Sequence, residues 1–126
     1  MMKEKKPKIN GRERSGCPIA STLDIIGDRW TLVLIRDLLN GKKRFSEFLE
    51  SPEHITASVL TARLKALEAS GIIEKQAYIL RPKRFEYVLT DSGRHLAPIL
   101  QAICHWGNEF IKDTWVAPSS FMNLKP

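Results

Sequence analysis

The chain is poor in the residues on which several protein classes depend. Its 126 residues include only two cysteines, Cys17 and Cys104, and their separation fits no metal-ligand spacing. No apolar run approaches the roughly 20 residues that a membrane-spanning helix needs, and the N-terminal stretch lacks the apolar core of a secretion signal. We therefore expect a cytoplasmic protein with reduced thiols, no metal and no other cofactor.

Acidic residues are also few, 14 against 20 Lys and Arg, which leaves a net charge of +6. This excess favours a polyanionic partner but does not choose among DNA, RNA and an acidic membrane surface. Residues 1–16 hold six basic and two acidic residues, so four of the six net charges lie there. That segment shows no apolar periodicity, and we predict a flexible basic arm over 1–16. One folded domain is expected over 17–113, followed by a tail over 114–126 that either packs on an interface with a second copy of the chain or frays.

Apolar residues at helical spacing predict two helices in the first third of the chain. Pro18 suits the first turn of the first helix, which ends at Gly27. Asp28 can cap the second helix, which is apolar around most of its circumference and ends at Asn40-Gly41. We predict that this second helix forms the centre of the core.

A helix-turn-helix unit is expected next. Ser46 can cap a short helix that reaches Glu50, and Thr56 can cap a longer helix that reaches Ser70 before Gly71 stops it. Two helices joined by a tight turn, the first of them short, form such a unit.

The longer helix has an outer face of small and polar residues. If its leucines face the core, the opposite face carries side chains that would let the backbone approach base edges in a major groove. The residues that we predict to read bases are Ala57, Ser58, Thr61, Ala62 and Lys65. The alternative is an ordinary amphipathic helix with a solvated outer face.

A basic hairpin follows, with strands expected over 73–80 and 84–90. Apolar residues alternate there with polar ones, as in half-buried strands, and they are Tyr78, Leu80, Phe85, Tyr87 and Leu89. Basic residues gather at the turn, where a hairpin tip beside a groove would meet phosphates. In the whole chain, the residues that we predict to contact phosphate are Lys42, Lys43, Arg44, Thr56, Arg63, Arg81, Lys83 and Arg84. Charged residues that only keep loops and strand edges soluble would look the same.

A long last helix is expected over 91–113, and its apolar stripe is wider than a domain of this size needs for internal packing. The residues of this stripe are Leu96, Ile99, Leu100, Ile103, Trp106, Phe110 and Ile111, and we predict that the first six form an interface. A second copy of the chain is the natural cover, so we predict a homodimer. The expected fold is mainly α, in the α+β class: a winged helix-turn-helix with a two-stranded wing and a C-terminal dimerisation helix.

Several stretches, in the same order, resemble the HxlR-type regulators, which are relatives of the MarR group. The first is Gly27-Asp28-Arg29-Trp30-Thr31 at the start of an apolar helix. The others are Arg44-Phe45-Ser46-Glu47-Phe48, Ile55-Thr56 through Leu60, Arg63-Leu64, Leu67-Glu68, Gly71-Ile72, Arg84-Phe85-Glu86-Tyr87, Leu89-Thr90, Gly93, Pro98 and Trp106-Gly107. Phe85 departs mildly, because the family more often has Val there. The resemblance implies a homodimer whose terminal helices form the interface, bound to inverted-repeat operators, usually as a repressor and sometimes as an activator.

Two features could make such a regulator responsive to a signal. Cys17 stands where some members of that family have a redox-sensing cysteine. A thiol at a helix N-terminus near Arg12 and Arg14 would have a lowered pKa, which makes Cys17 a candidate redox sensor, unless it is a small packing residue. Aromatic residues could also line a cavity for a small-molecule effector, unless they are plain core residues, and these are Trp30, Trp106 and Phe110.

No nucleophile–base–acid set, phosphate-cradling glycine loop or paired carboxylate is present, so we expect no enzyme. The sequence predicts a dimeric DNA-binding regulator, a repressor acting at a palindromic promoter site. One alternative is a non-specific nucleic-acid binder, including a binder of double-stranded RNA. Another is a winged helix that docks a protein partner, which the small outer face opposes mildly because interface anchors favour aromatic residues and Arg.

Overall fold

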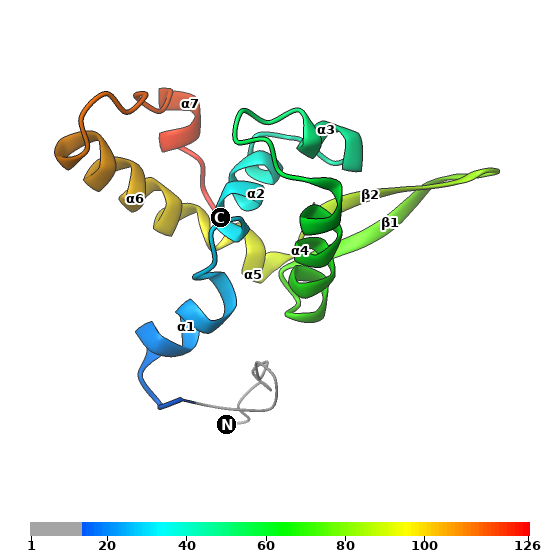
Figure 1. Ribbon diagram of the computed structural model, residues 1–126, viewed down its shortest axis with the longest axis horizontal. Helices are drawn as coiled ribbons and strands as arrows, with labels where there is room; N and C mark the ends of the chain where they lie inside the picture. The colour runs from blue at the N-terminus through cyan, green and yellow to red at the C-terminus, as the bar shows by residue number, and fades with distance from the viewer. Residues whose placement is uncertain (1–13) are drawn as a thin grey trace.

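The computed structural model describes residues 14–126, in which seven helices and one two-stranded antiparallel sheet follow one another (Figure 1). The elements are α1 (Pro18–Ile26), α2 (Thr31–Leu39), α3 (Phe45–Leu49), α4 (Ala57–Ala69), β1 (Ile73–Leu80), β2 (Lys83–Leu89), α5 (Asp91–Arg94), α6 (Ala97–Phe110) and α7 (Ser119–Met122). The predicted winged helix-turn-helix is confirmed in these elements. Residues 1–13 of the predicted basic arm lie outside the described residues.

The core is built around α2, as the sequence predicts. Leu34 and Ile35 of this helix are almost completely buried, and so are Phe48 of α3, Leu60 of α4 and Ile73 of β1. Because α3 and α4 contact each other and share one core cluster with α2, the helix-turn-helix unit is held at a fixed angle to the rest of the domain. Among the described residues, no helix is long and apolar enough to cross a membrane.

The boundaries of α4 follow local signals. The hydroxyl of Thr56 accepts a hydrogen bond from the backbone N–H of Val59 at 3.3 Å, which confirms Thr56 as the N-cap. Gly71 ends the helix with a φ of +74°, a conformation that residues with a Cβ rarely adopt. The start of α3 was predicted one residue late. Its first turn begins at Phe45, because the carboxylate of Glu47, rather than the Ser46 hydroxyl, accepts the N–H groups of Lys43 and Arg44, both at 2.9 Å.

The wing is more exposed than the sequence pattern predicts. β1 pairs with β2 from Ile73 opposite Leu89 to Leu80 opposite Lys83, with a register shift between Ala77 and Ile79. Figure 1 shows that the strands extend well beyond the helices at one end of the molecule. The apolar residues of the outer half are therefore not half-buried as predicted, and they are Tyr78, Leu80 and Phe85. Only the base of the wing packs on the core.

The single long C-terminal helix predicted from Asp91 to Asp113 is wrong, because the structure divides it into α5 and α6. Pro98 in the first turn of α6 has no N–H, and its ring would clash with the carbonyl of Arg94 in a continuous helix. The break lets α5 pack tightly on the base of the wing: a Cβ added at Gly93 would lie 2.3 Å from the carbonyl oxygen of Ile72.

The tail after α6 packs back on the domain. Phe121 in α7 is only 5% exposed, and the side-chain amide of Gln101 donates to the carbonyl oxygens of Phe121 and Leu124 at 3.1 and 2.9 Å. This part of the tail therefore does not fray, and the contacts that hold it are with its own subunit. The same packing covers Leu100 from within the subunit.

Candidate nucleic-acid interface

The outer face of α4 has the composition that the sequence predicts. Its core side is closed by Leu60, Leu64 and Leu67, each at most 2% exposed. The predicted base-reading residues are all exposed on the other side, and they are Ala57, Ser58, Thr61, Ala62 and Lys65. The Thr61 hydroxyl donates to the carbonyl oxygen of Ala57 at 2.9 Å, so its free capacity toward a base is as an acceptor.

A cleft of about 490 Å³ lies between the first turns of α2 and α4. Arg29 and Trp30 line one wall, and Ser58, Ala62 and Arg63 line the other. The guanidinium of Arg29 lies over the Trp30 ring at 5.5 Å. Arg29 is exposed beside the candidate base-reading face, a position that sequence reasoning missed. The available signal was its place in the Gly27–Thr31 motif, directly after the helix cap.

Asp28 fixes the geometry of this cleft. The N-cap of α2 is Trp30, two residues after the predicted Asp28, and Trp30 makes no side-chain capping bond. The Asp28 carboxylate instead reaches the start of α2 from the preceding turn: it accepts the N–H groups of Trp30 and Thr31 at 3.0 and 3.1 Å and the Thr31 hydroxyl. Burial alone would raise the pKa of Asp28, but these hydrogen bonds and the charge of Arg63 outweigh it and lower the pKa. Arg63 Nη1 lies 3.6 Å from Asp28 Oδ1. Arg63, predicted to contact phosphate, therefore also holds α4 against α2.

The turn before α3 attaches the helix-turn-helix unit to the wing. Arg44 lies over the ring of Tyr78 at 4.2 Å and pairs with Glu86 at 3.4 Å. The backbone carbonyl of Lys43 accepts the N–H of Tyr87 at 2.8 Å. Lys42 donates to the Ser51 hydroxyl at 2.8 Å. Of these three predicted phosphate contacts, Lys42 and Arg44 thus have structural partners.

The predicted cations of the wing tip are exposed, and they are Arg81, Lys83 and Arg84. The described part of the chain contains no acidic partner within ion-pair distance of any of them, so their charge is available to a polyanion. Their exposed position on the same chain segment that leaves α4 is what a wing requires.

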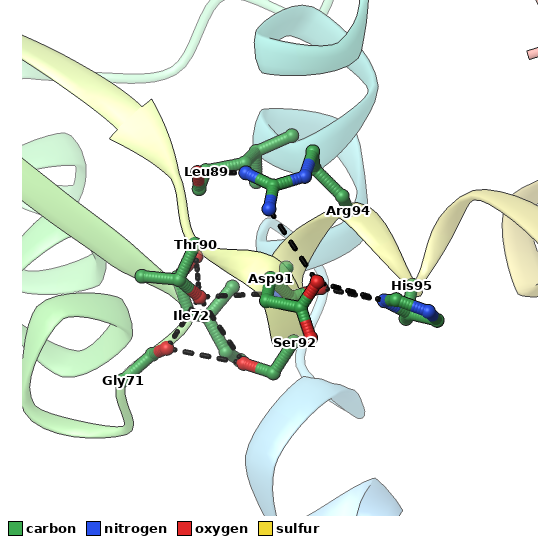
Figure 2. Close-up of polar contacts among 9 residues, drawn as sticks. Gly71, Ile72, Leu89, Thr90, Asp91, Ser92, Arg94 and His95 are labelled. Atoms are coloured by element: carbon green, nitrogen blue, oxygen red, sulfur yellow. Dashed lines mark hydrogen bonds and ion pairs between the residues drawn. The ribbon is translucent and has the colours of Figure 1, made fainter. Parts of the chain in front are cut away.

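A polar junction at the base of the wing sets its direction relative to α4, as Figure 2 shows. The hydroxyl oxygen of Thr90 lies 2.6 Å from the carbonyl oxygen of Gly71 at the end of α4, and it accepts the N–H of Gly93 at 3.3 Å. Ser92 donates to the same Gly71 carbonyl at 3.1 Å, and Arg94 donates to the carbonyl of Leu89 at 3.1 Å. The end of α4, the end of β2 and the start of α5 are thereby joined at one point.

A buried polar network connects α2 with the turn between α3 and α4, and sequence reasoning missed it. Asp37, 3% exposed, accepts hydrogen bonds from the hydroxyl of Ser51 and from Arg36. Arg36 also pairs with Glu53 at 2.6 Å, and the Glu53 carboxylate raises the pKa of Arg36. These pairs lie 14 and 17 residues apart in the chain, too far for a local pattern to indicate them.

Cys17, the candidate redox sensor, is exposed and is the N-cap residue of α1. Hydrogen bonds from the backbone N–H groups of Ala20 and Ile19 lower the pKa of its thiol. The proposed contribution of Arg14 is not found, because Arg14 pairs with Asp24 at 2.8 Å and donates to the carbonyl of Ala20. Arg12 lies outside the described residues.

The apolar stripe of α6 is only partly available to a second copy of the chain. Its exposed residues are Ile99, Ile103, Trp106 and Phe110, the last two 61% and 64% exposed. Leu100, predicted for the same face, is wrong as an interface residue because it is 5% exposed within the subunit's own core, and Leu96 is half-buried. Exposed Ile19 and Leu23 on α1 were missed, because their helical spacing looked like that of core residues.

The predicted aromatic cavity is not formed as expected. Trp30 borders the cleft beside α4, whereas Trp106 and Phe110 lie against each other on the exposed side of α6, with ring centroids 5.4 Å apart. A different cavity, of about 420 Å³, lies between α2, α6 and the C-terminal tail.

Comparison with known proteins agrees with this geometry. The family described as HxlR-like helix-turn-helix matches residues 25–114. YdeP of Bacillus subtilis, named as an uncharacterized HTH-type transcriptional regulator, is 42% identical over 75% of this chain and 74% of its own. The solved structure of the redox regulator HypR in its oxidized form has a TM-score of 0.68 and 42% identity over 74% of this chain and 96% of that one. The reduced form of the transcriptional regulator YodB from B. subtilis has a TM-score of 0.66 and 32% identity, covering 80% of this chain and 100% of that one. This chain belongs to the HxlR-like helix-turn-helix family, and it is a DNA-binding transcriptional regulator of the winged helix-turn-helix type.

Proposed function

We propose that the protein binds double-stranded DNA as a homodimer at a palindromic promoter site and represses transcription there. The observation that carries the proposal is the arrangement around α4: an exposed face of small residues lies between the cleft with Arg29 and the basic wing. Small side chains allow close approach to base edges, and unpaired cations on the flank supply the phosphate contacts that set register.

The roles of the residues follow from their positions. Ala57, Ser58, Ala62 and Lys65 read bases, and Thr61 accepts a hydrogen bond from a base or leaves room for one. Phosphates are neutralised by exposed cations of the wing and of the body, and these are Arg81, Lys83 and Arg84 on the wing and Lys43 and Arg29 on the body. The other predicted phosphate contacts mainly hold the helix-turn-helix unit in place through the bonds described above, and contact with phosphate is their second role. They are Thr56, Lys42, Arg44 and Arg63.

The exposed apolar residues of α1 and α6 support self-association. Six large side chains on these two helices are between 39% and 70% exposed, and they are Ile19, Leu23, Ile99, Ile103, Trp106 and Phe110. An exposed apolar surface of this extent favours burial against a partner. In a symmetric dimer, both subunits bury the same set of side chains. In Figure 1, α6 and the wing lie at opposite ends of the long axis, so pairing through α6 leaves the wing accessible.

Footprinting of the full chain on genomic DNA tests this proposal. We expect protected sites with two-fold symmetry and half-sites about one helical turn apart. In a competition assay, we expect the protein to prefer promoter DNA over random DNA and double-stranded RNA by a factor on the order of a thousand or more, as specific regulators do. Equal competition by random DNA and RNA would instead identify a non-specific nucleic-acid binder. Retained function after loss of the wing charges would favour a protein-docking module.

A redox response through Cys17 is a second element of the proposed function. It is supported by the exposure of the thiol, by its lowered pKa and by the similarity to HypR, which is named a redox regulator. Oxidation of Cys17 would change how α1 packs against a second subunit and so the spacing of the two α4 helices. Mild oxidant should lower promoter affinity of the wild type, and Cys17→Ser should abolish that change while Cys104→Ser preserves it.

A further inference from the structure

The C-terminal tail forms a strap that is tied to α6 at both ends. At one end the side-chain amide of Asn108 donates to the hydroxyl of Thr114 at 2.9 Å and to the carbonyl of Trp115 at 2.8 Å. At the other end the amide of Gln101 donates to the carbonyls of Phe121 and Leu124. We call residues 115–121 the strap. It lies beyond residues 25–114, which the HxlR-like family model matches, so it is a feature of this chain rather than of the shared pattern.

The strap does not collapse onto the helices beneath it. A cavity of about 420 Å³ remains between the strap, α2 and α6. Its walls are almost entirely apolar: Leu32 and Val33 come from α2, Leu100 and Ile103 from α6, and Ala117 and Phe121 from the strap. A space of this size lies within the range of small-molecule sites, and an apolar cavity of this kind gains little from holding water.

Arg36 is the one charged side chain among the lining residues, and it does not favour an anion. Its guanidinium already pairs with Asp37 at 2.9 Å and with Glu53 at 2.6 Å, so two carboxylates counter its single charge. A negatively charged ligand would meet no uncompensated cation in the wall, and it would lose its hydration. The electrostatics therefore select a neutral occupant.

We propose that this cavity is a binding site for a neutral, largely apolar small molecule of about two to three aromatic rings, held between the strap, α2 and α6. Its affinity comes from burial of apolar surface against α2, α6 and residues of the strap. This ligand would be the effector of the regulator, so the regulatory role of the site rests on the proposed function.

Occupancy of the cavity has a direct route to the helix-turn-helix unit. Arg36 lines the cavity and at the same time holds Glu53 in the turn before α4 and Asp37 beside Ser51. A ligand packed against Arg36 restricts its side chain and therefore orders the turn that Glu53 belongs to.

Fluorescence titration of the full chain with N-phenyl-1-naphthylamine, a neutral apolar probe, tests the site without DNA. We expect saturable binding of one probe per subunit. Val33→Phe and Ala117→Phe each fill the cavity from a different wall and should weaken binding at least tenfold. Ile79→Phe introduces the same phenyl side chain on the exposed wing and should leave binding unchanged. Thermal unfolding identifies any variant that fails to fold. If one of the two cavity-filling variants does not fold, the other is enough to test the site.

Amide hydrogen exchange gives the second readout. Probe binding should slow exchange around Glu53 and His54 at least threefold in the wild type, and Glu53→Gln should remove that effect. Absence of binding to the wild type, or equal binding by the filling variants, overturns the site. If Val33→Phe weakens self-association and the probe does not bind, the cavity is covered by a second copy and the proposal is wrong. Because no step uses DNA, failure here leaves the DNA-binding proposal standing, and the reverse also holds.

Discussion

Arg36 and Glu53 form a two-pronged ion pair, with Nη1–Oε2 and Nη2–Oε1 distances of 2.6 and 2.8 Å. The pair joins the middle of α2 to the turn that leads into α4. It is accessible to water at one side, since the two side chains are 29% and 34% exposed. Its bidentate geometry nevertheless fixes the direction of the turn, because a planar guanidinium facing a carboxylate allows little rotation.

The first prediction concerns the dependence of this pair on pH. The hydrogen bonds from Arg36 lower the pKa of Glu53 below its ordinary value of 4.5, so the folded state favours the ionised carboxylate. That contribution is present above pH 4.5 and is lost as the pH falls through the lowered pKa. Glu53→Gln should therefore cost about 1 kcal/mol in the free energy of unfolding at pH 7, and less at pH 3.

Urea unfolding at both pH values measures this difference. Glu50→Gln is the matched control, because the structure assigns Glu50 no ion pair within the described residues. A difference between wild type and Glu53→Gln that stays constant from pH 7 to pH 3 would contradict the assigned role.

The second prediction concerns the buried carboxylate beside that pair. Asp37→Ala removes the acceptor for Ser51 and one of the two partners of Arg36, and it leaves polar groups without partners in the core. We expect a loss of about 3 kcal/mol in the free energy of unfolding. Asp24→Ala removes a carboxylate whose partner, Arg14, is 61% exposed, and should cost about 0.5 kcal/mol or less. Similar losses for the two variants would show that the buried network is not a structural anchor.

The third prediction concerns the junction at the base of the wing. Thr90→Val keeps the shape of the side chain but removes the hydroxyl that caps α5 and contacts the Gly71 carbonyl. The expected cost is about 1–2 kcal/mol, with faster hydrogen exchange in both strands because the wing loses its attachment to α4. Thr90→Ser retains the hydroxyl and should behave almost as the wild type does. Equal destabilisation by both variants would assign the effect to the methyl group instead.

The fourth prediction separates phosphate contact from base reading. Arg84→Ala should weaken binding to all DNA sequences alike and reduce the slope of log affinity against log salt by about 1. Ala62→Ser should instead change which sequence is preferred, with little change in that slope. Fluorescence anisotropy over a salt series measures both quantities, with Lys112→Ala, an exposed cation just after the end of α6, as the control. A wing variant that altered sequence preference would reverse the assigned roles.

Agreement between sequence and structure is best where the signal is local. Thr56 and Gly71 bound α4 as expected, because a cap hydroxyl and a residue at positive φ act within one helical turn. The exposed face of α4 follows from the positions of its three core leucines in the same way. The break between α5 and α6 at Pro98 could also have been predicted locally, but the apolar stripe that continues on both sides of Pro98 favoured a single helix.

Agreement fails where residues distant in the sequence meet. Leu100 has the same spacing as its exposed neighbours on α6, yet it is buried, because the tail packs over that side of the helix. Tyr78 and Phe85 alternate as half-buried residues do, yet no helix reaches the outer half of the wing to cover them. The pattern of apolar residues indicates which side chains can be buried, but the packing of the whole chain decides which of them are buried.

The order and type of the elements from α1 to β2, the composition of the outer face of α4 and the family could be predicted from the chain itself, through hydrogen bonds and periodicity that operate over a few residues. The tertiary structure alone decided which apolar side chains remain exposed, how Arg36 reaches Glu53, and that a cavity lies between the tail and the helices. The physical reason is that burial and ion pairing depend on distances in space, and those distances are set only once all the helices pack together.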